Sequence, residues 1–319
     1  MHVRKAVISA AGRGARLYPS ADTVQKAMLP VVDRDGLAKP VIQIIAEEAL
    51  ESGIEEICIV TAPGDAQGYE RQFSALRENL LRTYEGAAWA ESGARRIDDL
   101  IGRIRFAEQR EPLGYGHAVG CAEEFVGGEP FLLLLGDHLY ISHLSGRRCA
   151  QQLIELATRR ECAVAAVQST REHLIGRYGT LSGRRLPDSA NAYRIEAIVE
   201  KPSVSRAEIE LQTPGLRVGH YLCFFGMHVL TPAIFGLIRE SVPSQPGEIH
   251  LTPALQELAR RETYLALEIE GTRYDIRGKF GLLQAQIAFA MSGSDRDHLL
   301  TTVVDTLAES AARGQGPAR

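Results

Sequence analysis

Short apolar runs alternate with amphipathic stretches along the first half of the chain. The apolar runs have the length and the bounding turns of buried strands: 5–10, 56–61, 104–108, 131–135 and 163–167. Apolar residues at helical spacing lie between them and predict these helices: 41–52, most of 69–103, 117–125 and 153–160. This order predicts an α/β fold of the Rossmann-like kind, with a mostly parallel central sheet and helices on both of its faces.

The pattern changes after about residue 170. Strand patterns separated by turns occupy 178–181, 193–200 and 219–228. They predict a small antiparallel extension that closes over the carboxyl ends of the sheet. The remaining predicted elements are helices near 232–239, 252–261 and 281–291, a strand at 264–269, and a terminal amphipathic helix over 295–312.

No stretch rich in Pro, Gly or Ser divides the chain into independent domains. We therefore expect one domain over residues 1–292, made of two halves at about 1–170 and 171–292. A C-terminal helix and a frayed tail would occupy 293–319.

The composition is that of a globular protein, with 319 residues, of which 45% are hydrophobic and 24% are charged. The net charge of −4 and the lack of a dense Lys/Arg cluster argue against binding of nucleic acid. Five cysteines without a CxxC spacing predict buried free thiols in a reducing compartment. Because no apolar run spans about 20 residues and no signal-peptide pattern opens the chain, we expect a cytoplasmic protein without a membrane segment.

A glycine loop follows the first predicted strand. Gly12 and Gly14 allow the backbone to approach a ligand closely, and Arg16 and Lys26 follow within reach of the same anion. The spacing fits neither a Walker A loop nor a dinucleotide-binding GxGxxG motif. The glycine loop alone also fits a purely structural turn, and Lys26 alone also fits a surface lysine. The combination of the two is therefore the informative feature.

That combination, Ala-Gly-x-Gly-x-Arg followed by Lys-x-Met-Leu-Pro, resembles the signature of the sugar nucleotidylyltransferases. Within that family the Lys-Ala-Met-Leu-Pro-Val-Val-Asp form is most similar to the bacterial UTP–glucose-1-phosphate uridylyltransferases. The resemblance implies that Arg16 and Lys26 grip a triphosphate and that Ala11, Gly12 and Gly14 contact the nucleotide. Ala15 stands where the family has Thr.

The segment 108–119 resembles the base-binding stretch of the same enzymes. A glutamine amide offers the donor and the acceptor that a uracil edge requires. The resemblance implies that Gln109 and Gly114 hold the base. His117 is expected to pack on its neighbours at the start of a helix and not to act as a general base.

Two aspartates are the candidate ligands of a metal ion. Asp137 directly follows the buried strand at 131–135, at the sheet edge where ligands bind in open α/β folds. Asp275 lies in a stretch similar to the family's Asp-x-Gly-x-Lys-x-Gly, in which Arg277 replaces the first glycine. The resemblance implies a Mg²⁺ ion on Asp137 and Asp275. Arg277 could pair with Asp275, pair with phosphate or crowd the metal site.

Residues 199–202 are the candidates for binding a sugar phosphate. Their Glu-Lys pair would place Glu200 and Lys201 on opposite faces of an extended chain. The resemblance implies that Glu200 accepts hydrogen bonds from sugar hydroxyls, that Lys201 binds the sugar phosphate and that Gly179 lies over the sugar. His250 and Pro253 depart from the family pattern near this side.

The family implies that a hexose 1-phosphate attacks a nucleoside triphosphate, with UTP and glucose 1-phosphate as the expected pair. Arg16, Lys26 and Lys201 would be the catalytic cations. The alternatives are another nucleotide, a modified sugar or cyclitol phosphate, and a non-catalytic nucleotide-sugar sensor. The family also implies a homo-oligomer.

Overall fold

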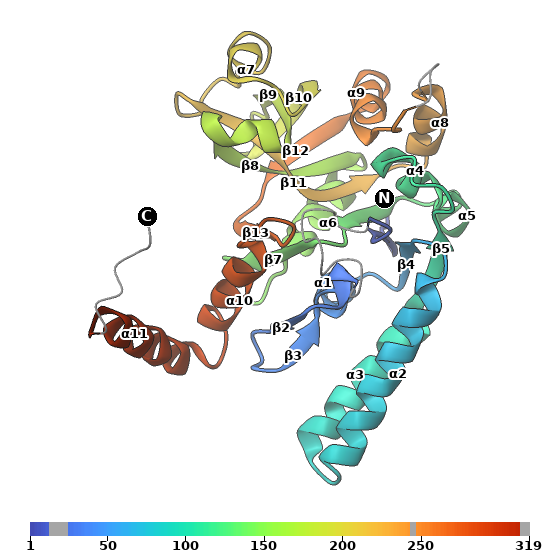
Figure 1. Cartoon of the computed structure of the whole chain (residues 1–319). Helices are drawn as coiled ribbons and strands as arrows, with labels where there is room; N and C mark the ends of the chain where they lie inside the picture. The colour runs from blue at the N-terminus through green and yellow to red at the C-terminus, as the bar shows by residue number, and fades with distance from the viewer. Residues whose placement is uncertain (13–24, 243–246, 313–319) are drawn as a thin grey trace.

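A computed structural model describes residues 1–12, 25–242 and 247–312. Its centre is a nine-stranded sheet in the order β5-β4-β1-β6-β11-β8-β12-β10-β9 (Figure 1). The strands are β1 (Lys5–Ser9), β4 (Glu56–Thr61), β5 (Ile104–Glu108), β6 (Phe131–Leu135), β8 (Ala163–Arg171), β9 (Gly179–Arg185), β10 (Ala192–Glu200), β11 (His220–Leu230) and β12 (Tyr264–Glu268).

The α/β fold and the bounds of β4, β5 and β6 are as predicted, and β6 lies inside the sheet. The parallel pairs are β5–β4, β4–β1, β1–β6 and β8–β12. The structure differs from the prediction in one detail, because the antiparallel strands are not confined to a small extension over the carboxyl ends of the sheet. β11 pairs antiparallel with both β6 and β8, so the second half of the chain continues the same sheet.

Helices cover both faces of the sheet, as the pattern predicted. The helices are α1 (Val41–Leu50), α2 (Asp65–Thr83), α3 (Ala88–Arg103), α4 (Tyr115–Gly120), α5 (Glu123–Val126), α6 (Cys149–Arg160), α7 (Val204–Glu210), α8 (Ala233–Glu240), α9 (Leu251–Arg261), α10 (Gly281–Met291) and α11 (Arg296–Ala312). The predicted helix over 117–125 is divided into α4 and α5, since residues 121–122 form a turn after Gly120. Helix α10 has the predicted bounds.

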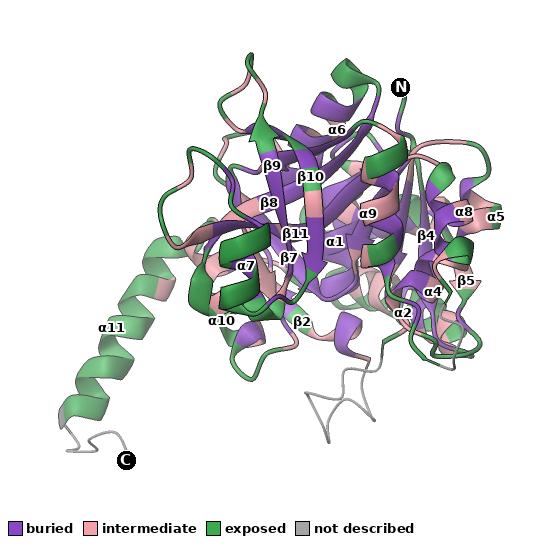
Figure 2. Cartoon of the chain, turned by 90° about the horizontal axis from the view of Figure 1, so that it is seen from above, coloured by how far each residue is buried: buried purple, intermediate pink, exposed green. Residues whose placement is uncertain are grey.

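Because successive side chains of a strand point to opposite faces, the sheet contributes to two apolar layers, one on each face. In β6, Leu132 and Leu134 belong to the layer under α1, α6 and α10, whereas Phe131 and Leu133 belong to the layer under α4, α8 and α9. Figure 2 shows the buried sheet between its covering helices. The five cysteines are free, and Cys121 alone is half-buried while the other four are buried, in agreement with the prediction.

Two short antiparallel pairs of strands were not predicted from the sequence. One is the hairpin of β2 (Pro30–Val32) and β3 (Ala38–Pro40), and the other pairs β7 (His138–Ser142) with the distant β13 (Gly271–Asp275). These strands have three to five residues and lack the longer continuous apolar runs of β4 and β6. The β7–β13 pair brings the two predicted metal ligands to one place.

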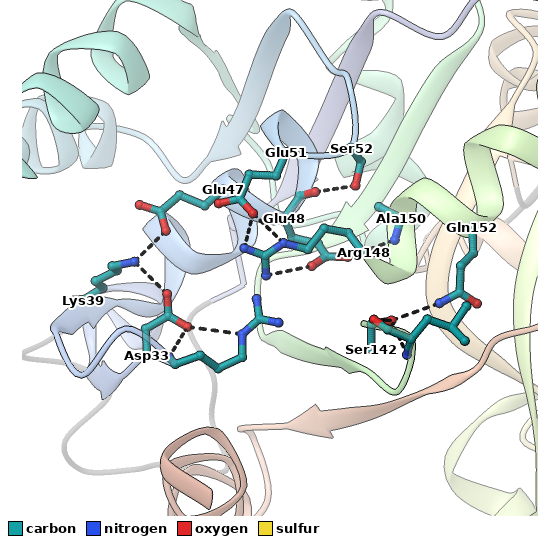
Figure 3. A network of polar contacts seen from close by, with 12 residues as sticks. Asp33, Lys39, Glu47, Glu48, Glu51, Ser52, Ser142, Arg148, Ala150 and Gln152 are labelled. Carbon is teal, nitrogen blue, oxygen red and sulfur yellow. Dashed lines mark hydrogen bonds and ion pairs between the residues drawn. The ribbon is translucent and has the colours of Figure 1, made fainter. Parts of the chain in front are cut away.

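Buried polar groups tie the β2–β3 hairpin to α1 and α1 to α6 (Figure 3). Lys39 Nζ donates to Asp33 Oδ2 at 2.7 Å and to Glu47 Oε2 at 2.9 Å. Glu48, which is 3% exposed, accepts a hydrogen bond from the backbone N–H of Ala150 at 2.9 Å in the first turn of α6. These contacts satisfy donors that the fold would otherwise bury unpaired.

Helix α11 extends away from the body of the molecule, and the hairpin of α2 and α3 projects on the other side (Figure 1). The apolar side chains Leu300, Val303, Val304 and Leu307 of α11 are exposed within the chain. Among the described helices, none is both long enough and apolar enough to cross a membrane.

Candidate active site

The parallel strands bring the glycine loop and the first aspartate together. β1 and β6 are neighbours, so Ser9 lies opposite Leu135 at their carboxyl ends. The N–H of Gly136 donates to the carbonyl of Ser9 at 2.9 Å, and a Cβ at residue 136 would come within 2.6 Å of that oxygen. Only glycine allows this approach, which places Asp137 beside the loop that contains Gly12.

Lys26 and Asp137 form a buried ion pair. Lys26 lies in the 3-10 helix η3 (Lys26–Met28), and its Nζ is 2.6 Å from Asp137 Oδ2. The two residues are 8% and 7% exposed. A Cβ at Gly12 would lie 3.5 Å from the same Nζ, so the glycine loop contacts this pair. Lys26 therefore lies beside Gly12, where both could face one anion.

Asp137 is surrounded by positive groups. His138 Nδ1 lies 2.8 Å from its Oδ1, and Arg277 Nε lies 3.6 Å from its Oδ2. Burial alone would raise the pKa of Asp137. The hydrogen bond from His138 and the charges of His138, Lys26 and Arg277 outweigh burial and hold this pKa well below its ordinary value. The carboxylate therefore stays ionised at any pH at which the protein works.

The antiparallel pairing of β7 with β13 places the second aspartate beside the first. Asp275 lies opposite His138 in the register, and the N–H of Ile276 donates to the carbonyl of Asp137 at 3.1 Å. One ligand atom from each of Asp137, His138 and Asp275 lies within 4.8 Å of the others. Carboxylate oxygens are the donors that Mg²⁺ prefers, so the residues suit a divalent cation.

Arg277 occupies both oxygens of Asp275. Its Nε donates to Oδ1 at 2.8 Å and its Nη2 to Oδ2 at 2.7 Å. Burial would raise the pKa of Asp275, but the hydrogen bonds from Arg277 and the nearby positive charge lower it overall. Of the possibilities that the sequence left open for Arg277, the structure shows the pair with Asp275.

The segment predicted to read the base packs against residues 248–250. Gln109 is 8% exposed, and its Nε2 donates to the carbonyl of Gly114 at 3.0 Å. Gly114 has φ +100°, and a Cβ there would lie 2.9 Å from the carbonyl of Ile249. His117 Nδ1 lies 3.1 Å from Gln109 Nε2 and 3.0 Å from the carbonyl of Glu111, so His117 packs on its neighbours as expected.

The sugar-side residues come from two paired strands. Gly179 of β9 lies opposite Glu200 of β10. Lys201 has φ +44°, a left-handed conformation that is strained for a residue with a side chain. Its Nζ lies 3.3 Å from Glu200 Oε1. The prediction that Glu200 and Lys201 lie on opposite faces of an extended chain was therefore wrong, because the backbone turns at Lys201.

The helix after His250 completes this side. Thr252 Oγ1 donates to Glu200 Oε2 at 2.8 Å and holds the carboxylate. His250 and Thr252 line the same cavity as Glu200, whereas Pro253 is absent from its described lining. Of His250 and Pro253, the two departures from the family pattern on the sugar side, His250 is the one placed to contact a ligand.

These groups face one cavity of about 680 Å³. Among the described residues, its lining contains most of the predicted site: Ala11, Gly12, Lys26, Gln109, Gly114, Asp137, Gly179, Glu200 and Lys201. Asp275 borders it through Arg277. Gly14 and Arg16 lie outside the described residues. The described lining contains five basic side chains and three carboxylates, so an acidic chain presents a positively charged cavity here.

Sequence reasoning missed several residues of the lining. Arg177 and Arg273 are two of its basic groups, and the guanidinium of Arg273 lies 3.9 Å from the ring centre of Tyr178. Strand alternation could have found Arg273, because residues two apart on a strand share a face with Asp275. His228 also lines the cavity, and its Nδ1 lies 2.7 Å from the hydroxyl of Tyr264.

Comparisons with known proteins agree with the geometry. The sequence model of a family described as "Nucleotidyl transferase" matches residues 5–276. UTP–glucose-1-phosphate uridylyltransferase YngB of Bacillus subtilis (strain 168) is 37% identical over 308 residues, which cover 96% of each chain. UTP–glucose-1-phosphate uridylyltransferase 1 of Streptococcus pyogenes serotype M1 is 34% identical over 294 residues, covering 91% of this chain and 89% of the relative.

A solved structure of UDP-glucose pyrophosphorylase complexed with UDP-glucose superposes with a TM-score of 0.73 at 30% identity. The superposition covers 90% of this chain and 98% of that one. The resemblance that the motifs predicted is thereby confirmed.

Proposed function

The chain belongs to the nucleotidyl transferase family, and from this premise we propose that its cavity joins UTP to glucose 1-phosphate, giving UDP-glucose and pyrophosphate. The observation that carries the proposal is the convergence of two ion pairs on one cavity. Lys26 with Asp137 comes from the parallel half of the sheet, and Glu200 with Lys201 comes from the antiparallel half. Each pair has a cation that can receive one of two phosphate-bearing substrates.

The reaction forms one bond and breaks one bond. A phosphate oxygen of glucose 1-phosphate attacks the α-phosphorus of UTP, and the bond from that phosphorus to the departing pyrophosphate breaks. The attacking oxygen is already an anion, so no base is needed, in line with the packed position of His117. Catalysis then depends on position and on neutralisation of charge.

The residues divide these tasks. Lys26 lies beside Gly12 and would contact the triphosphate, and Gln109 and Gly114 would hold the uracil. Lys201 would bind the phosphate of the sugar. Glu200, held by Thr252, would accept hydrogen bonds from the hydroxyls of glucose.

The predicted Mg²⁺ site consists of Asp137 and Asp275, of which Asp137 would be the ligand of the ion because Arg277 already engages Asp275. When bound, the ion supplies positive charge beside the phosphates. Asp137 itself would keep Lys26 in place through the 2.6 Å ion pair.

The proposal assigns the nucleotide to the half at about 1–170 and the sugar to the half at 171–292, since the cavity takes its lining from both. It also includes a cytoplasmic homo-oligomer. The exposed apolar side chains of Val304 and Leu307 make α11 the expected contact between subunits. Light scattering from the full chain should then give a mass above 34.9 kDa.

The test is release of pyrophosphate by the full chain with Mg²⁺, glucose 1-phosphate and each of UTP, dTTP, ATP and GTP in turn. We expect the highest kcat/KM with UTP. Faster turnover with another nucleotide, or none with glucose 1-phosphate, would overturn the assignment of substrates.

A pair of matched variants locates the sugar. Glu200→Gln should raise the KM for glucose 1-phosphate by about tenfold or more and leave the KM for UTP within about twofold, because a lost charged hydrogen bond is worth about 1.5–3 kcal/mol. Glu210→Gln makes the same chemical change on the exposed face of α7 and should leave both constants unchanged. Equal effects of Glu200→Gln on the two substrates would contradict the assigned role.

A further inference from the structure

Arg277 is held firmly at the edge of the cavity. Besides its two side-chain bonds, its backbone N–H donates to Asp275 Oδ1 at 2.9 Å. The turn that carries it is fixed by Gly281, where a Cβ would come within 2.0 Å of the carbonyl of Asp275. The Arg277 side chain is 33% exposed, so it is partly desolvated and still borders the cavity.

The position of the Arg277 guanidinium conflicts with the binding of one divalent cation by both Asp137 and Asp275. The two oxygens of Asp275 each accept a hydrogen bond from Arg277, and Asp137 Oδ2 lies 3.6 Å from the same guanidinium. A cation that approaches the shared ligand set meets a fixed positive charge at short range, where partial burial limits screening. The ion must displace the guanidinium or bind Asp137 alone.

We propose that Arg277 is a resident cation of the active site, which engages Asp275 and keeps the affinity of the free protein for a divalent ion low. Asp137 is then the carboxylate that remains for the ion, and the ion enters together with the phosphates of the nucleotide, whose oxygens replace the ligand that Asp275 does not supply. The assignment of nucleotide rests on the proposed function. The competition between Arg277 and the ion does not.

The test is the binding of Mn²⁺ to the full chain without substrates, measured by the loss of the free-ion signal in electron paramagnetic resonance. Arg277→Gly introduces the residue of the motif that this segment resembles, and Arg277→Gln removes the charge but keeps a donor for Asp275. Both should bind Mn²⁺ at least about tenfold more tightly than the parent protein, as expected for removal of a nearby charge of the same sign. Arg277→Lys keeps the charge but loses the bidentate pair with Asp275, so it should bind Mn²⁺ more weakly than Arg277→Gln.

Two further variants separate this role from a structural one. Lys279→Gly removes an equal charge from the exposed residue two positions away and should change the affinity by less than about twofold. Asp275→Asn in the Arg277→Gly background should remove the gained affinity, because the freed carboxylate is then absent. If Arg277→Gly fails to fold, as circular dichroism would reveal, Arg277→Gln carries the test.

Equal Mn²⁺ affinities of the parent protein, Arg277→Gln and Arg277→Lys would overturn the proposal. Binding by Arg277→Lys as tight as that by Arg277→Gln would overturn it as well, since the charge would then be irrelevant. A chain that fails to release pyrophosphate from UTP but shows the expected order of Mn²⁺ affinities would refute the proposed substrates and leave the role of Arg277 intact.

Discussion

The buried pair of Lys26 and Asp137 leads to a prediction in which stability and rate respond differently. At 2.6 Å the attraction between the two charges is about 6 kcal/mol at an effective dielectric constant of about 20, before the cost of desolvation. Removal of one partner of a buried pair typically destabilises a protein by about 3–5 kcal/mol. Lys26→Met should lie near the lower end, because Asp137 keeps the contacts with His138 and Arg277.

Asp137→Asn should cost more, about 4 kcal/mol, because it leaves a buried ammonium group beside a neutral amide. The double variant Lys26→Met/Asp137→Asn should also cost about 4 kcal/mol, which corresponds to a coupling energy of about 3 kcal/mol between the two positions. Urea denaturation followed by circular dichroism measures these differences in the free energy of unfolding.

The rate should follow the loss of charge. Each single variant should lower kcat by about 100-fold or more, as for other electrostatic groups that act in the transition state. The double variant should be at least as slow as the slower single variant, because it lacks the charge that neutralises phosphate even though its second substitution adds no further loss of stability.

An exposed ion pair provides the matched control. Arg206 and Glu210 lie one helical turn apart in α7 at 3.0 Å and are about half exposed. The same cycle with Arg206→Met and Glu210→Gln should give a coupling energy below about 0.5 kcal/mol and no change in kcat. A coupling below about 0.5 kcal/mol at Lys26 and Asp137, or an active double variant, would refute the reasoning.

Two buried titratable groups predict opposite dependences of stability on pH. Burial lowers the pKa of His228 to about 3, whereas the ordinary pKa of about 6.5 applies in the unfolded chain. Below pH 6.5 the unfolded chain therefore binds an extra proton, and the free energy of unfolding falls with falling pH, by about 2 kcal/mol at pH 5. His228→Gln should remove this loss, and the same change in urea midpoint between pH 7.5 and pH 5 in the parent protein and the variant would contradict it. Burial raises the pKa of Glu48 to about 7, so ionisation opposes folding as pH rises from about 4.5 to 7, and stability is lower above pH 7. The amide oxygen of Glu48→Gln can still accept from Ala150. As pH rises from 4.5 to 8, this variant should therefore gain up to about 3 kcal/mol in the free energy of unfolding relative to the parent protein, in the same denaturation assay. A difference that does not change with pH would show that Glu48 is already ionised at low pH.

The sequence could predict those parts of the fold that depend on local patterns. The apolar runs of β4, β5 and β6 are bounded by turn residues, so their limits agree with the structure. The partner of a strand is not encoded in its own alternation, and this explains why the place of β11 between β6 and β8 was missed. A register that joins β7 to β13 across more than a hundred residues is equally invisible locally.

Lys201 shows the same limit at a single residue. A residue before proline favours an extended backbone, which made the prediction of opposite faces reasonable. The tertiary contacts override this preference, because the N–H of Lys201 donates to the carbonyl of Tyr178 at 3.1 Å and φ becomes +44°. A strained residue of this kind persists only where the surrounding structure enforces it, and such residues cluster at functional sites.

The charges of the cavity connect the two proposals. Five basic side chains and three carboxylates in the described lining leave a small positive excess when no substrate is present, and Arg277 reduces that excess by engaging Asp275. On the proposed function, a triphosphate and a sugar phosphate bring more negative charge than this small excess of basic groups can neutralise. A divalent ion is therefore unfavourable beside Arg277 in the free protein and favourable once the nucleotide is present. The same arginine that weakens binding of the free ion thus makes its entry depend on the substrate that requires it.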